Sequence, residues 1–167
     1  MGFFDKVKGF FGSGDAKTKI EIIRVEDPFP FQDPMHKGVA LVTAEAGTIT
    51  VKGYVAKFIA KVKNSEGNEE EVELGVDDSA ASNWIGDDFP AKPATLQKGE
   101  SLEVAFFIGD MDLVASLGKY GITNAETASI KGATFKIKIM IDIAETNFMF
   151  DPEAERAVKV ANNPEKV

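Results

Sequence analysis

The chain has 167 residues, of which 44% are hydrophobic and 28% charged, so it is long and apolar enough to fold around one core. The absence of cysteine excludes disulfides, thiolate metal sites and cysteine nucleophiles, and no apolar run reaches the roughly 20 residues of a membrane-spanning helix. The protein is acidic, with a net charge of −8, and it has no basic stripe with interleaved aromatic residues, which argues against a nucleic-acid partner.

Residues 1–14 are predicted to form an amphipathic helix and a linker. The apolar side chains of MGFFDKVKGFF would fall within about 120° of one another on a helix: Phe3, Phe4, Val7, Phe10 and Phe11. So short a helix, with two glycines, is marginal alone in water and needs a surface to lie on. We favour docking on protein, which is the body of this domain, another copy of the chain or a partner. Weak contact with a membrane surface and disorder are the alternatives, since two lysines and one aspartate attract anionic lipid little.

Residues 15–150 are predicted to form an antiparallel β-sandwich, because short runs with a hydrophobic period of two alternate with glycine and proline turns. The segment 26–34 contains three prolines, so we expect an extended connection or an edge there. The expected strands are residues 19–25, 38–44, 48–64, 70–76, 101–109 and 133–144.

Two of these strands carry more detailed predictions. In the run 48–64 the apolar positions change parity between Val51 and Phe58, which predicts a β-bulge near Gly53. In the run 133–144, isoleucine or phenylalanine at every second position from Phe135 predicts one face toward the core and one toward solvent.

The remaining segments are predicted to be loops and short helices. Residues 77–93 are loop-like, and residues 112–121 form a short helix capped by Asp112 and ended by glycine. The tail, residues 151–167, is predicted to begin a helix capped by Asp151 and to end in disorder.

Three stretches occur in a familiar order: a proline-rich segment leading into GVALVTA, the long run TITVKGYVAKFIAKV, and LQKGESLEVAFFI. Together they resemble the arrestin-like β-sandwich, and in particular the N-terminal half of bacterial sporulation-control proteins, over residues 17–145. The chain departs from that family in having length for one sandwich instead of two, DPMHKG before GVALVTA, and the extra helix over 112–121. The resemblance implies an all-β, immunoglobulin/arrestin-like fold and a non-catalytic interaction module without cofactor or catalytic residues.

The search for chemical motifs supports no enzyme. His36 is the only histidine, and we expect it in a surface loop because no nucleophile motif accompanies it. Trp84 is the only tryptophan; it is interpreted as a plug over one end of the sandwich or as a hot spot for a partner.

Paired carboxylates are the other candidates for chemistry: Asp77 with Asp78, Asp87 with Asp88, and Asp110 with Asp112. We interpret them as solvated loops and helix caps, and expect no metal site, because no EF-hand spacing is present. A calcium site and a carboxylate-dependent hydrolase are the alternatives.

These observations predict a cytoplasmic, non-enzymatic protein-interaction or scaffold domain with a regulatory role. The alternative is a peripheral membrane-associated regulator that is recruited by the amphipathic segment of residues 1–14. The candidate partner-binding residues are Phe3, Phe4, Val7, Phe10, Phe11 and Trp84.

Overall fold

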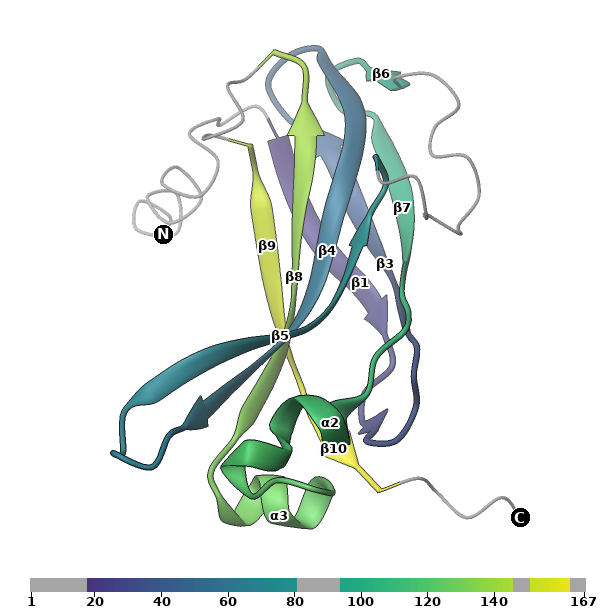
Figure 1. Cartoon of the computed structure of the whole chain (residues 1–167). Helices are drawn as coiled ribbons and strands as arrows, with labels where there is room; N and C mark the ends of the chain where they lie inside the picture. The colour runs from purple at the N-terminus through teal and green to yellow at the C-terminus, as the bar shows by residue number, and fades with distance from the viewer. Residues whose placement is uncertain (1–17, 81–93, 146–150, 163–167) are drawn as a thin grey trace, which may run out of the picture.

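The computed structural model describes residues 18–80, 94–145 and 151–162, in which two β-sheets pack face to face with short helices at one end (Figure 1). The helical elements are α2 (Leu113–Leu117), the 3-10 helix η1 (Gly118–Tyr120) and α3 (Ala125–Ile130). The strands are β1 (Thr18–Val25), β2 (Phe29–Pro30), β3 (His36–Ala44), β4 (Ile49–Lys63), β5 (Glu69–Asp78), β6 (Ala94–Leu96), β7 (Ser101–Ile108), β8 (Thr134–Ile143), β9 (Glu153–Val158) and β10 (Val160–Ala161). The predicted β-sandwich is confirmed, whereas the helix predicted within residues 1–14 lies outside the described residues.

The smaller sheet has the strand order β1-β3-β7, and the larger has the order β5-β4-β8-β9 with β6 added beside β4. All strand pairs in these two sheets are antiparallel. Their inner faces share one core, to which Val42 and Phe106 contribute from the smaller sheet and Phe58 and Ile139 from the larger. Since successive side chains of a strand point to opposite faces, the same strands also present outward rows of residues.

A β-bulge at Gly53 changes which residues of β4 face the core, as the change of parity predicts. The pairing of β4 with β8 shifts register between Val51 and Gly53. Val51 is buried before the shift, and Tyr54 and Phe58 are buried after it. A second shift, at Phe58 and Ile59, interrupts the pairing of β4 with β5. Because bulges increase local twist, the β4–β5 hairpin turns away and its tip extends beyond the edge of the sandwich (Figure 1).

Strand β8 shows the alternation predicted for residues 133–144. Its outward positions include Lys136 and Lys138, which are partly exposed. Its inward positions are all buried: Phe135, Ile137, Ile139, Ile141 and Ile143. One face of the larger sheet therefore forms core while the other faces solvent.

The helices lie between β7 and β8 in the chain. Asp112 caps α2 as predicted, since its side chain accepts the backbone N–H of Ala115 at 2.9 Å. The pattern of apolar residues did not predict α3, which has six residues and buries only Ala128. Its start is fixed by a capping box, in which the side chains of Asn124 and Thr127 each bond to the other's backbone.

The prediction of a helix at the start of residues 151–167 is wrong, because Glu153–Val158 form strand β9 beside β8. Asp151 caps no helix; its carboxylate accepts the backbone N–H of Ile143 at 3.2 Å. Without β9 the edge of β8 would carry unpaired backbone groups, and pairing with it outweighs local helix preference. The larger sheet therefore extends past residue 150. Disorder is predicted for the end of this tail, and residues 163–167 lie outside the described part of the chain.

The proline-rich segment 26–34 is a connection, as predicted, but only the two residues of β2 are extended, and bends at residues 27–28 and a turn at residues 31–32 make up much of the rest. Strand β2 runs parallel to β10. The backbone N–H groups of Phe29 and Phe31 donate to the carbonyls of Lys159 and Ala161, each at 2.7 Å. This pair joins the segment after β1 to the end of the larger sheet. No helix among the described residues is long and apolar enough to cross a bilayer.

Candidate functional site

The partner-binding residues suggested by the sequence all lie outside the described residues: Phe3, Phe4, Val7, Phe10, Phe11 and Trp84. The same holds for Asp87 and Asp88. Their roles stay predictions, and the candidate site below is built from other residues.

The only histidine is buried in the core, so the prediction of a surface loop histidine is wrong. His36 begins β3, and its ring centroid lies 4.3 Å from that of Phe29 and 4.6 Å from that of Phe58. Its Nε2 donates to the carbonyl oxygen of Glu26 at 2.9 Å, since a carbonyl can only accept, and Nδ1 has no hydrogen-bond partner among the described residues. Burial lowers the pKa of His36 to about 4. This neutral ring packs the core and is closed to any substrate.

Asp77 is also buried, which contradicts its interpretation as a solvated carboxylate. Its Oδ2 accepts the hydroxyl of Tyr54 at 2.6 Å and the backbone N–H of Phe107 at 2.8 Å. Burial raises the pKa of Asp77, although both hydrogen bonds act to lower it. Asp77 therefore links β5 of the larger sheet to β7 of the smaller sheet.

Asp78, Asp110 and Asp112 are the other described members of the predicted carboxylate pairs, and the hydrogen bonds of Asp78 and Asp112 are local. Asp78 accepts the backbone N–H of Ala80 at 3.0 Å, and Asp112 caps α2. Asp110 adopts a positive φ of 55° after β7. Within residues 18–80, 94–145 and 151–162, no three histidine, aspartate or glutamate side chains gather closely enough to hold a metal ion.

A groove of about 560 Å³ lies on the outer face of the smaller sheet. It runs over the end of β1, the start of β3 and the end of β7. The strand register places Arg24, Val39 and Ala105 in one row across the sheet and sets Lys37 beside Phe107 in the next. The floor is thus apolar and its sides carry charge, a combination typical of surfaces that bind other proteins.

The charges around the groove are mostly positive in a chain that is acidic overall. Its lining contains Arg24, Lys37 and Arg156 against a single carboxylate, that of Glu26. The Nζ of Lys37 lies 5.8 Å from the centre of the Phe107 ring, so the ammonium group stays beside the apolar floor.

The ion pair at the groove can exchange partners. Arg24 bonds Glu103 at 3.3 Å, with the two side chains 63% and 60% exposed. An exposed pair of this kind contributes about 1 kcal/mol at most, so a carboxylate from a partner can replace Glu103.

Gly38 brings the strands together beneath this groove. A Cβ atom at Gly38 would lie 2.3 Å from Cζ of Phe106 and 2.8 Å from the carbonyl oxygen of Arg24. The glycine therefore lets the Phe106 ring lie against the backbone of β3, which fills the core directly below the groove.

Arg156 closes the side of the groove that faces the larger sheet. It extends from β9, and its Nη1 donates to the carbonyl oxygen of Ile22 in β1 at 3.2 Å. The pairing of β1 with β3 shifts register between Ile22 and Arg24, so this carbonyl belongs to an irregular stretch of β1. A side chain of one sheet thus satisfies the backbone of the other.

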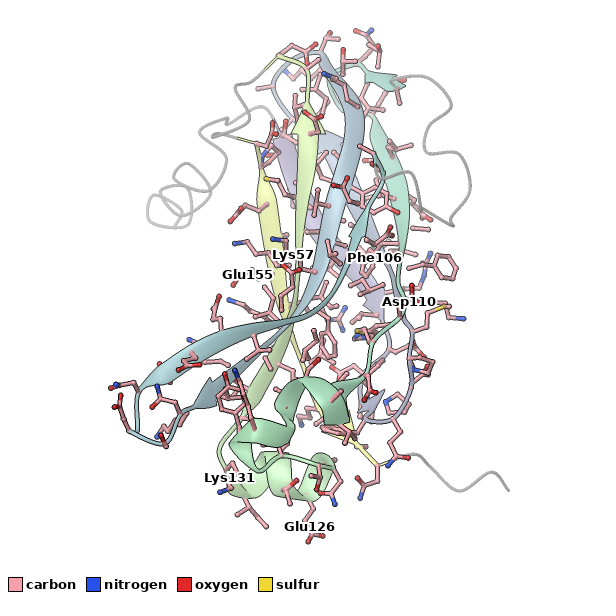
Figure 2. All side chains as sticks on the ribbon, in the orientation of Figure 1. Lys57, Phe106, Asp110, Glu126, Lys131 and Glu155 are labelled. Atoms are coloured by element: carbon pink, nitrogen blue, oxygen red, sulfur yellow. The ribbon has the colours of Figure 1, made fainter. Side chains whose placement is uncertain are left out.

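The outer face of the larger sheet is a poorer candidate because its charges pair with one another. Lys57 bonds Glu73 at 3.2 Å, and Lys138 bonds Glu153 at 3.6 Å. Lys57 and Glu155 mark this face in Figure 2. Lys136 bonds Glu71 at 3.3 Å and Glu155 at 3.2 Å. Burial alone would lower the pKa of Lys136, but the bonds to Glu155 and Glu71 raise it.

The groove was missed from the sequence because its rows of residues run across strands. Val39 and Phe107 belong to different strands, and only the register makes them neighbours on one face. One signal was present: GVALVTA is apolar at both parities, so the strand had to expose apolar residues on one of its two faces.

The described residues form an antiparallel β-sandwich with a groove on its smaller sheet, and this is the arrestin-like fold that the sequence pattern predicts. Comparison with protein-family models and with curated protein sequences gives no match. A crystal structure of Spo0M, the sporulation control protein from Bacillus subtilis, has a similar fold, with a TM-score of 0.58 and 13% sequence identity. The similarity covers 89% of this chain and 51% of Spo0M, so the chain spans about half the length of that protein. It confirms the resemblance to sporulation-control proteins at the level of the fold.

Proposed function

We propose that the chain is a non-enzymatic protein-interaction domain that binds an acidic partner segment in the groove of the smaller sheet. The observation that carries the proposal is the register of β1, β3 and β7, which brings Val39, Ala105 and Phe107 together under Arg24 and Lys37. A role in regulation is compatible with the similar fold of Spo0M, a protein described as a sporulation control protein.

The chemistry of the groove sets the partner. The lining carries three basic side chains and one acidic one, so a segment with carboxylates at its edges and one or two apolar side chains fits best. Lys37 forms no ion pair with another described residue, which leaves its ammonium group available to a partner carboxylate. Binding should therefore weaken as salt is added.

The test is selection of peptides from a random library on the full chain. We expect enriched peptides with aspartate or glutamate beside apolar residues, and we expect Lys37→Glu and Phe107→Ser to abolish their binding without lowering the melting temperature by more than a few degrees. Val114→Ser is the matched control, because Val114 is 41% exposed on α2, away from the groove. Basic peptides, or acidic peptides that bind both groove variants as well as the unchanged chain, would refute the proposal.

Two further measurements separate the remaining possibilities. Light scattering on the full chain tests whether the partner is a second copy, in which case Phe107→Ser should lower the mass. Binding to vesicles that disappears when residues 1–11 are deleted, with no peptide selected by the groove, would instead favour the peripheral membrane-associated regulator.

A further inference from the structure

A second pocket, of about 730 Å³, lies between the tip of the β4–β5 hairpin and the segment from η1 to the end of α3. Three lysines line it: Lys63 at the end of β4, Lys119 in η1 and Lys131 after α3. Lys131 lies at the helical end of the molecule, beside the hairpin (Figure 2). The lysines come from three separate parts of the chain and meet only in the folded structure.

None of these three lysines forms an ion pair with another described residue, although the pocket contains a carboxylate. Glu70 is held instead by neutral donors. Its Oε2 accepts from the side-chain amide of Asn64 at 2.7 Å and its Oε1 from the hydroxyl of Tyr120 at 2.7 Å. The bonds from Asn64 and Tyr120 lower the pKa of Glu70, and the charge of the nearby Lys119 lowers it further.

Two of the lysines lie against the wall of the pocket. Gly121 follows η1 with a φ of 78°, and a Cβ atom there would lie 3.4 Å from Nζ of Lys131. The Nζ of Lys119 is 5.2 Å from the centre of the Tyr120 ring. Lys63, Lys119 and Lys131 are all exposed, so their ammonium groups are open to a ligand in solution.

We propose that this pocket binds a phosphate monoester. Three lysines and one glutamate give the lining a net charge of +2, which matches the charge of about −1.5 to −2 on such a group at pH 7 better than that of a carboxylate. Lysine binds phosphate as a point charge and requires no planar pairing. By contrast, Lys57, Lys136 and Lys138 on the larger sheet are already paired with glutamates. The pocket is separate from the groove, so either proposal can fail without the other.

The test is titration of the full chain, labelled with ¹⁵N, at constant ionic strength. The probes are glycerol 3-phosphate, chloride as the control anion, and phosphatidylcholine vesicles with and without phosphatidic acid, which carries the same monoester. We expect saturable amide shifts at Ser65, Gly67 and Gly121 with the soluble ester, or retention on vesicles that requires phosphatidic acid. The responding probe identifies the source of the phosphate. No response to either probe beyond that to chloride overturns the proposal.

The variant Lys119→Gln with Lys131→Gln should weaken binding of the responding probe at least tenfold. Lys19→Gln with Lys98→Gln removes the same charge from exposed positions outside the pocket and should leave binding within twofold of the unchanged chain. Equal weakening by both pairs would show a response to net charge alone and would overturn the site. Circular dichroism checks that both double variants fold. If the variant with both pocket lysines replaced does not fold, Lys119→Gln alone should weaken binding at least threefold.

Discussion

The Oδ2 atom of Asp77 accepts the backbone N–H of Phe107 at 2.8 Å and so joins the open edges of the two sheets. The same oxygen accepts the hydroxyl of Tyr54 at 2.6 Å. On the opposite side of the sandwich, Arg156 donates to the carbonyl of Ile22. Each of the two seams between the sheets is therefore bridged by an ionisable side chain of the larger sheet bonded to the backbone of the smaller sheet.

Replacing Asp77 should lower the free energy of unfolding, and the loss should be larger when the new side chain cannot accept the hydrogen bonds from Tyr54 and Phe107. Asp77→Ala removes the acceptor of two hydrogen bonds, and a buried donor that finds no other acceptor costs about 1 to 3 kcal/mol. Asp77→Asn keeps an oxygen acceptor and should cost less. Urea unfolding measures both free energies, and Asp142→Asn is the control because Asp142 is exposed on β8. Equal losses from the alanine and asparagine variants would contradict the acceptor role.

Arg156→Met should also lower the free energy of unfolding, since it keeps the apolar stem but removes the bond to Ile22. A hydrogen bond from a charged group contributes about 1.5 to 3 kcal/mol. Arg24→Met is the comparison, and we expect it to cost less than about 1 kcal/mol because the ion pair of Arg24 with Glu103 is exposed. The bridge has no structural importance if both variants unfold at the same urea concentration.

Gly38→Ala should destabilise the protein by about 1 to 3 kcal/mol, because the new methyl group must displace the Phe106 ring or the backbone of Arg24. Gly109→Ala is the matched control, since nothing lies within 4 Å of a Cβ at Gly109. Thermal melts of both variants give the comparison. A Gly38→Ala protein as stable as Gly109→Ala would show that the strands can move apart at no cost.

Burial of His36 should make stability depend on pH. Its pKa is about 4 in the folded protein and near 6.5 when unfolded, so between these values the unfolded chain binds the proton and the folded chain does not. The contribution of His36 to the free energy of unfolding is complete above pH 6.5. It falls by about 3 kcal/mol in total as the pH drops to 4. The nearby carboxylates of Asp33 and Asp27 oppose the shift but do not reverse it.

His36→Phe tests this dependence, since phenylalanine keeps an aromatic ring between Phe29 and Phe58 but takes up no proton. The free energy of unfolding, measured by urea at pH 7 and pH 4.5, should fall less for the variant than for the unchanged protein. Parallel losses in the two proteins would mean that other groups cause the acid sensitivity.

Much of the sandwich could be predicted because its strands bury one face each, and a period of two is visible in sequence. The bulge at Gly53 followed from the same rule, since a change of parity in one strand needs an extra residue. Strand β9 could not be predicted in this way. The segment from Glu153 to Val158 lacks an apolar period of two in its sequence, although its side chains alternate between more and less exposed in the strand, and its strand conformation comes from the open edge of β8.

Burial of polar residues was the harder part to predict. His36 and Asp77 lie in segments rich in proline or aspartate, and such composition normally indicates solvent exposure. His36 bonds to the carbonyl of Glu26, and Asp77 bonds to the backbone of Phe107 and the hydroxyl of Tyr54. Backbone partners cannot be recognised from residue types, and all three partners lie at least ten positions away in the sequence. The groove depends on register in the same way.

Pairing of β10 with β2 has a consequence for synthesis on the ribosome. Lys159 donates its backbone N–H to Asp27, 132 positions earlier, so the ends of the described chain meet only after every other described strand has emerged. Until then β8 presents an open edge to other nascent chains. Chains truncated before residue 153 should therefore associate through β8, whereas chains that include residue 162 should not.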